Sequence, residues 1–386
     1  MVTLQTADGA LKEFYLDAIK KEIDGKISPF FSMIEKSSTN VVGKNVNKIV
    51  KTGVHGSIGA GSETGDLPQG DSTNNLTLKA SLKNLYGTIQ ISDKAVRASA
   101  SNEGALVNLL NEEMQELVQS AKYNFSRMLF GDGNGTVAVV SASEAPNIVY
   151  VEDAHSLEEG MYVDIYEHGQ KSIPNVRITR VDKLANLLEL EGVNWNDGVL
   201  DADSKLVFHG VEPEYELTGL RALFSEQEIY GQDRSTEYMR PLILVADGAF
   251  DLKYVDELID GAEARGGGKI NLIFCSWRVK RYILRLAREN NIEIGTTTIG
   301  DNVVVPTYDG IPIVVDRFCP DSAVYFLNTD DFKICQLCDW QWMEGEDGKI
   351  LKQVPGKPVY TATLVKYAEL LCEKPCGQAA IVGIEF

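Results

Sequence analysis

Four cysteines near the C-terminus are the residues whose type and spacing most suggest a chemical site. They form two close pairs, Cys335 with Cys338 and Cys372 with Cys376, which is the outward form of a structural zinc site. Zinc needs four thiolates that converge tetrahedrally, yet the first pair lies in an apolar, strand-like run, where residues three apart point to opposite faces. The second pair also encloses Pro375. The sequence therefore favours reduced thiols packed as small apolar side chains, with zinc and a disulfide as alternatives.

The sequence shows no recognisable set of residues for acid–base or nucleophilic catalysis. None of the four histidines stands beside a serine or cysteine in a nucleophile motif, and the G-x-S-x-G, H-E-x-x-H and P-loop patterns are absent. We therefore expect no catalytic residue and no cofactor. The histidines are His55, His155, His168 and His209.

Two further patterns fit a ligand site poorly. Residues 266–269, Gly-Gly-Gly-Lys, follow a predicted helix and precede a predicted strand, which reverses the order that cradles phosphate. A polar cluster between residues 194 and 203 has oxygen ligands for calcium but lacks the ordered spacing and bidentate glutamate of an EF-hand. We interpret it as a solvated turn and keep calcium as the alternative. The cluster consists of Asn194, Asn196, Asp197, Asp201 and Asp203.

Composition restricts the class of protein. The chain has 386 residues, enough for two or three domains, with 44% hydrophobic and 24% charged residues, as in ordinary globular proteins. The net charge of −19 argues against binding nucleic acid through the overall field, although an acidic wall is compatible with a container for DNA. No run reads as a signal peptide or a membrane span, so we expect a cytoplasmic product with no membrane partner.

A long amphipathic helix organises the middle of the chain. Between residues 105 and 130 apolar residues recur at steps of three and four, and Gly131 and Gly133 supply the stop. A strand over residues 85–92 precedes this helix, and the loop Gly-Asp-Gly-Asn-Gly at 131–135 follows it.

This order of strand, long helix and Gly-Asp-Gly-x-Gly loop resembles the major capsid proteins of tailed bacteriophages, which have the Hong Kong 97 fold. The resemblance implies an α+β protein whose long helix is the spine of a peripheral domain with a β-sheet. It also implies an N-terminal arm, an extended β-hairpin loop, an α/β axial domain and an inserted all-β domain. The corresponding ranges are 1–45 for the arm, 46–91 for the hairpin, 92–142 for the spine helix and peripheral domain, 143–213 for the inserted domain, 214–355 for the axial domain and return strands, and 356–386 for the last peripheral strands.

Two N-terminal segments bury themselves poorly. Apolar residues of the arm, including Phe30 and Phe31, have little nearby sequence to cover them, so the arm lies over its own chain or over another subunit. Strands over 46–60 and 76–82 form a hairpin with a polar, glycine-rich tip, and such a hairpin exposes strand edges. In the resembling family this hairpin reaches onto a neighbouring subunit. Candidate interface residues are therefore Phe30, Phe31, Gly65 and Pro68.

The predicted secondary structure changes twice in the second half of the chain. Five short strands between residues 148 and 209 predict a small barrel or sandwich. Helices over 252–262 and 277–289, the second capped by Ser276, then alternate with strands in an α/β unit. One face of the second helix carries four arginines that meet solvent, carboxylates of an adjacent copy, or phosphate. These interface candidates are Arg278, Arg281, Arg285 and Arg288.

The resemblance implies a shell subunit that assembles as hexamers and pentamers into an icosahedral head around double-stranded DNA. Expected partners are copies of the same chain, a separate scaffolding protein, a portal, and packaged DNA through non-specific contact. The protein would then be a virion component assembled in the host cytoplasm. Two alternatives remain: an encapsulin-like bacterial compartment shell, and a zinc-binding or enzymatic protein that uses the C-terminal cysteines.

Overall fold

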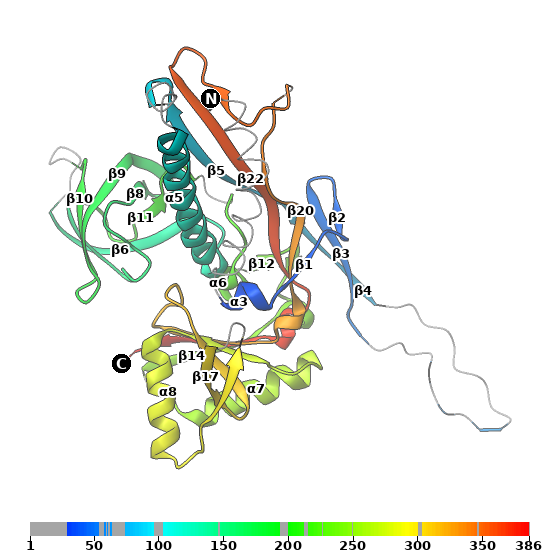
Figure 1. Ribbon diagram of the computed structural model, residues 1–386. Coiled ribbons are helices and arrows are strands. Elements are labelled where there is room, and N and C mark those ends of the chain that lie inside the picture. The colour runs from blue at the N-terminus through cyan, green and yellow to red at the C-terminus, as the bar shows by residue number, and fades with distance from the viewer. Residues whose placement is uncertain are drawn as a thin grey trace.

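The computed structural model describes residues 29–53, 58, 60, 62–63, 74–95, 103–145, 147–193, 200–211, 215–225, 227–248, 250–299, 303–345 and 347–385. These residues form a helix-backed sheet, a closed barrel, an α/β unit and a projecting hairpin (Figure 1). Short elements connect them: α6 (Leu220–Ser225), β12 (Glu228–Ile229), β13 (Gln232–Asp233), η3 (Glu237–Met239), η4 (Thr329–Asp331) and η5 (Pro375–Gly377).

The spine helix α5 (Glu103–Phe130) packs on one face of a five-stranded sheet. Alternation along β5 (Lys83–Ser92) turns Leu85, Ile89 and Ile91 inward. Gly87 shares that face, and a Cβ there would lie 2.7 Å from Leu117 of α5, so the helix crosses where the strand has no side chain. The helix and the strand before it confirm the sequence prediction. The other strands are β1 (Glu35–Ser37), β20 (Phe332–Trp342), β21 (Lys352–Gln353) and β22 (Val359–Cys372).

The short helix α3 (Pro29–Met33) corrects one prediction about the arm. Phe30 is fully buried, with its ring centroid 5.6 Å from Phe274 and 5.3 Å from Phe332. Phe31 is 2% exposed and lies 5.3 Å from Phe125 of α5. Assigning these two residues to a subunit interface was therefore wrong, because a helix and two strands distant in sequence bury them within the same chain. Residues 1–28 of the predicted arm lie outside the described residues.

The predicted hairpin is present, with a shorter first strand. β3 (Asn45–Lys51) pairs with β4 (Asn75–Ser81) from Asn45↔Ser81 to Lys51↔Asn75, and β2 (Val41–Val42) adds a third strand. β3 covers only the first part of the predicted strand over 46–60, since Thr52, Gly53, Ile58 and Ala60 are not in a strand. Figure 1 shows β3 and β4 leaving the body on the side opposite the barrel. Gly65 and Pro68 lie outside the described residues.

The segment predicted as an inserted domain contains most of a closed six-stranded barrel with strand order β10-β7-β6-β11-β8-β9. Its core is aliphatic and includes fully buried Val149, Ile165 and Leu206. Besides the five predicted strands, β6 joins the barrel, so the barrel begins at Thr136 rather than at residue 143. The strands are β6 (Thr136–Ala145), β7 (Ile148–Val151), β8 (Tyr162–Glu167), β9 (Gln170–Asp182), β10 (Leu187–Glu191) and β11 (Lys205–Phe208).

The α/β unit contains a seven-stranded sheet with order β14-β23-β19-β15-β18-β17-β16. Two helices, α7 (Leu252–Gly266) and α8 (Trp277–Glu289), pack on one face of it. Ser276 caps α8 as predicted, accepting a hydrogen bond from the backbone N–H of Val279. The strands are β14 (Leu242–Gly248), β15 (Leu272–Cys275), β16 (Gly295–Ile299), β17 (Val303–Tyr308), β18 (Ile311–Val315), β19 (Ala323–Leu327) and β23 (Ala379–Ile384).

The C-terminal strand corrects a second prediction. β23 was expected in the peripheral sheet with β22, but it pairs in parallel with β14 and antiparallel with β19. The turn η5 directs the chain away from β22, past α7, where Gly266 and Gly377 are so close that a Cβ on Gly266 would lie 2.5 Å from the Gly377 Cα. Because Ala379, Ala380 and Ile381 are fully buried, the apolar run suits a central strand covered on both faces.

Candidate functional surfaces

The four C-terminal cysteines do not converge in the structure. Cys335 on β20 lies opposite Glu369, whereas Cys372 lies opposite Phe332, three residues along the ladder. That spacing is about 10 Å, too far for a shared metal with bonds of about 2.3 Å to each sulfur. All six cysteines are free thiols, and burial raises the pKa of Cys335 to about 11. Within the described ranges no group of three or more potential metal ligands occurs.

The calcium and histidine candidates are likewise dispersed. Asp201 and Asp203 border a shallow hollow of about 270 Å³ at one end of the barrel, beside His168, and the other three members of the polar cluster lie outside the described residues. His155 lies near Asp153 on the surface, at 3.7 Å.

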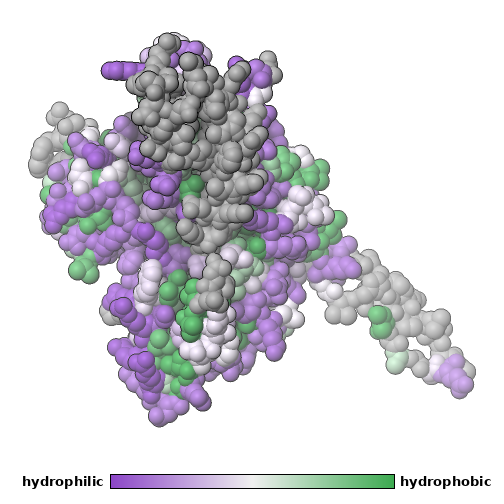
Figure 2. Space-filling view, viewed as in Figure 1, coloured by the Kyte–Doolittle hydropathy of each residue, from purple (hydrophilic) through white to green (hydrophobic). Residues whose placement is uncertain are grey.

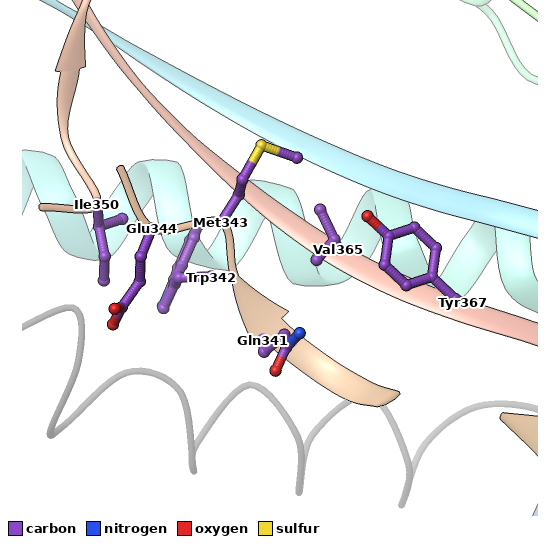
Figure 3. A pocket seen from close by; sticks show the side chains of 7 residues that line it. All are labelled: Gln341, Trp342, Met343, Glu344, Ile350, Val365 and Tyr367. Carbon is purple, nitrogen blue, oxygen red and sulfur yellow. The ribbon is translucent and has the colours of Figure 1, made fainter. Parts of the chain in front are cut away.

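A hollow of about 560 Å³ lies on the face of the five-stranded sheet opposite α5 (Figure 3). Val365 and Tyr367 of β22 form one wall, and the end of β20 with the loop after it forms the other. Most of the lining is apolar or aromatic, and it holds no histidine, cysteine or serine. An apolar and aromatic lining of this kind is suited to packing against a chain segment. The lining residues are Gln341, Trp342, Met343, Glu344, Ile350, Val365 and Tyr367.

A buried ion pair fastens the barrel to the spine helix. Arg127, in the last turn of α5, donates to both carboxylate oxygens of Glu216, one at 2.9 Å from Nη1. The two residues are 5% and 2% exposed, and the guanidinium also lies over the Phe208 ring, 5.4 Å from its centroid. Phe208 ends the barrel and Glu216 begins the return to the body, so this pair fixes where the barrel meets the helix.

A second contact sets the orientation of the barrel. Glu158 of the barrel forms ion pairs with Arg317, which follows β18, and with Lys183 at 3.1 Å. Burial alone would raise the pKa of Glu158, but hydrogen bonds from these two cations lower it. The Tyr123 hydroxyl of α5 donates to the Ser156 carbonyl. The barrel is thus held to both the spine helix and the α/β unit.

Two buried carboxyls were not predicted as special from the sequence. Asp164, with no exposed surface, accepts from Lys171 and the Asn175 backbone at 2.8 Å and pairs with His209 at 2.7 Å. Burial alone would raise its pKa, but these hydrogen bonds lower the pKa to about 2. Glu369 of β22 is also fully buried, and burial raises its pKa to about 7. The sequence signal that could have predicted both buried carboxyls is a single acidic residue within an apolar run.

The predicted arginine face of α8 is exposed. Arg278, Arg281, Arg285 and Arg288 all face solvent, opposite buried Val279, Ile283 and Ala287. Arg278 is 4.0 Å from Asp321 and Arg285 is 4.0 Å from Glu289. Figure 2 shows apolar surface around β17 beside the hydrophilic surface of α8; Val303 and Val304 of β17 are 59% and 66% exposed.

Of the helices in the described part of the chain, none combines the length and apolar composition needed to cross a bilayer. Among the exposed features of the described residues are a charged helix face, aliphatic residues on β14 and β17 of the seven-stranded sheet, and a projecting hairpin. Such features suit contact with other protein surfaces.

No protein-family model and no curated protein sequence matches the chain. Among solved structures, a subunit in the capsid of cyanophage A-1(L) is similar over 93% of this chain and 93% of its own, with 11% identity and a TM-score of 0.55. The SrpI encapsulin of Synechococcus elongatus is similar over 93% of this chain and 89% of its own, with 10% identity and a TM-score of 0.50. The chain therefore has a mixed α+β fold like that of tailed-phage major capsid proteins.

Proposed function

We propose that this chain is the major capsid protein of a tailed bacteriophage, a Hong Kong 97-type shell subunit that forms hexamers and pentamers of an icosahedral head. The observation that carries the proposal is the similarity to the cyanophage capsid subunit over nearly the whole of both chains. The head would enclose double-stranded DNA, be assembled in the host cytoplasm with a separate scaffolding protein and a portal, and persist in the virion.

The physical argument for assembly is independent of that similarity. The hairpin of β3 and β4 projects from the body (Figure 1) and exposes Ile49 at 65%. Val245 on β14, an end strand of the seven-stranded sheet, is 73% exposed. A monomer with exposed aliphatic residues on strand edges risks uncontrolled aggregation, whereas a closed shell covers those edges in a defined way.

The net charge of −19 is consistent with a wall around DNA. A strongly acidic lining repels phosphates, so contacts with packaged duplex would be few and non-specific. The duplex could then be packed and released without sticking to the shell.

The direct test is assembly. The chain should be purified alone and with a candidate scaffolding protein, then examined by light scattering on a sizing column and by negative-stain imaging. We expect rings, sheets or closed shells of uniform diameter. A stable monomer of 42.5 kDa in both preparations would contradict the proposal.

The similarity to SrpI makes an encapsulin-type compartment the second candidate. The two functions differ in cargo. Shells isolated from the native source should contain nuclease-protected double-stranded DNA if the protein is a phage capsid, and a specific cargo protein with little DNA if it is an encapsulin.

A further inference from the structure

An apolar face of the five-stranded sheet surrounds the hollow of about 560 Å³. Tyr86 of β5 pairs with Val365 of β22, and its ring lies edge-on to Tyr367 with the centroids 6.4 Å apart, so these three side chains share one face. It is the face opposite α5, because Gly87, next to Tyr86, faces the helix. Tyr86 is 58% exposed, and Met343 in the lining of the hollow is 38% exposed. Aromatic and aliphatic side chains exposed together on one face of a sheet mark a site where another segment packs.

The sequence before the described residues offers a matching surface. Residues 10–23, which we call the N-terminal segment, lie outside the described residues. Their apolar residues recur at steps of three and four, which predicts a helix with one apolar side. A single helix of fourteen residues is only marginally stable in water, so this side needs a surface to pack on. The apolar stripe consists of Leu11, Tyr15, Ala18, Ile19 and Ile23, and the opposite side carries Glu13, Asp17 and Lys20.

The chain enters the described residues beside the same sheet. The Phe30 ring centroid lies 5.3 Å from that of Phe332, the first residue of β20. From Phe332 to Gln341, where the hollow begins, β20 advances about 30 Å. A linker of residues 24–28 spans up to about 17 Å, and a helix over residues 10–23 adds about 21 Å. The N-terminal segment is therefore long enough to reach the hollow of its own chain.

We propose that the N-terminal segment binds as a helix over the hollow of its own chain, with its apolar stripe against Met343, Val365 and Tyr367. This contact goes beyond the shell function, because it belongs to a single chain and forms whether or not the chain assembles. The covalent link decides the occupant: a short linker gives the segment an effective concentration on the order of millimolar at this face. The same segment of a second copy, or a separate protein, would have to displace it from dilute solution.

A photocrosslinker locates the segment in the full chain. p-Benzoylphenylalanine in place of Tyr15, on the apolar stripe, should form a covalent adduct with Met343 or another lining residue of the hollow, identified by mass spectrometry of the digest. The adduct should run as a monomer of 42.5 kDa on a denaturing gel, because both of its ends belong to one chain. The matched control carries the same group in place of Asp17, on the opposite side of the predicted helix. Its yield of adduct at the hollow should be at least about tenfold lower.

Proteolysis measures how firmly the segment is bound. Trypsin cleaves after Lys20 and Lys21, and cleavage of a bound helix requires that the helix first open. Leu11→Asp in the stripe and Met343→Glu in the hollow should each speed this cleavage about tenfold or more, because each places a charge in the apolar contact. Leu184→Glu is the matched control, because Leu184 is fully exposed on the barrel, and it should be cleaved at the wild-type rate. Far-UV circular dichroism and thermal unfolding establish that each variant is folded.

Each result decides between the possible occupants. An adduct that joins two chains would overturn binding within one chain and assign the hollow to the segment of a second copy. An adduct outside the hollow, or equal yields from positions 15 and 17, would overturn the site. Cleavage of Met343→Glu at the wild-type rate would overturn it as well. Assembly is a separate measurement, since a wild type that stays monomeric contradicts the proposed function and leaves this contact intact.

Discussion

Replacing Arg127 with alanine should destabilise the protein far more than a change of one side chain suggests. The substitution leaves the Glu216 carboxylate, 2% exposed, without its partner. Removing one member of a buried ion pair costs about 3–5 kcal/mol, because an uncompensated charge remains in a poorly hydrated site. Contact with the Phe208 ring is lost as well.

The assay is urea unfolding of the unassembled chain, followed by circular dichroism. With a slope of about 3 kcal/mol per molar urea, a loss of about 4 kcal/mol lowers the midpoint by roughly 1.3 M. The matched control is Arg180→Ala, which breaks an ion pair of 2.9 Å with Glu189 on the barrel surface, where the side chains are 57% and 37% exposed. That change should cost less than about 1 kcal/mol.

A double substitution distinguishes the cost of an unpaired buried charge from the cost of losing the ion pair itself. R127M/E216L removes both charges and should lie within about 1 kcal/mol of wild type, since apolar residues of similar volume often replace a buried ion pair without loss. The Arg127 Nε atom lacks a hydrogen-bond partner, so the double substitution also removes a buried, unsatisfied donor. If Arg127→Ala costs no more than Arg180→Ala, the barrel is not fastened by this pair and the reasoning fails.

Three further outcomes follow from the described contacts. Gly219→Ala should lower the thermal midpoint sharply, because a Cβ there would lie 2.4 Å from the Met128 carbonyl oxygen, whereas Gly53→Ala, with its nearest neighbour at 3.6 Å, should change it little. Burial raises the pKa of Glu369 to about 7. The protonated side chain therefore stabilises the fold fully below its unfolded pKa of about 4.3, and the free energy of unfolding falls by roughly 3 kcal/mol as pH rises to 7. In Glu369→Gln the free energy of unfolding should depend less on pH over that range, and an unchanged slope would contradict the assignment. Asp164 behaves oppositely, because its folded pKa of about 2 makes it stabilising above pH 4 and progressively less so below; Asp164→Asn should lose about 2–3 kcal/mol at neutral pH and converge with wild type near pH 2 in unfolding experiments.

Short-range sequence patterns were sufficient to predict those elements whose structure depends on neighbouring residues. The spacing of apolar residues predicted α5, and Ser276 predicted the start of α8, because helix periodicity and capping depend on residues within a few positions. The exposed arginines of α8 follow from the same periodicity, since Val279 and Ile283 fix which side faces the sheet.

Long-range pairing was not readable in this way. Phe30 and Phe31 seemed uncovered because Phe125, Phe274 and Phe332, which bury them, are distant in sequence. β23 is an apolar run that any central strand could have, and only the turn at η5 assigns it to the seven-stranded sheet. The Arg127–Glu216 pair joins residues 89 positions apart, with no local pattern to link them.

The barrel has a consequence for how such chains diversify. Its two ends lie together: Thr136 pairs with Val207, and the Phe208 N–H donates to the Gly135 carbonyl at 3.1 Å. A segment whose ends meet can be deleted, exchanged or enlarged without altering the path of the surrounding polypeptide. Leu184, fully exposed on the turn between β9 and β10, marks a tip where added sequence would meet only solvent. The barrel is thus a replaceable cassette, and a natural position for inherited variation or for peptide display.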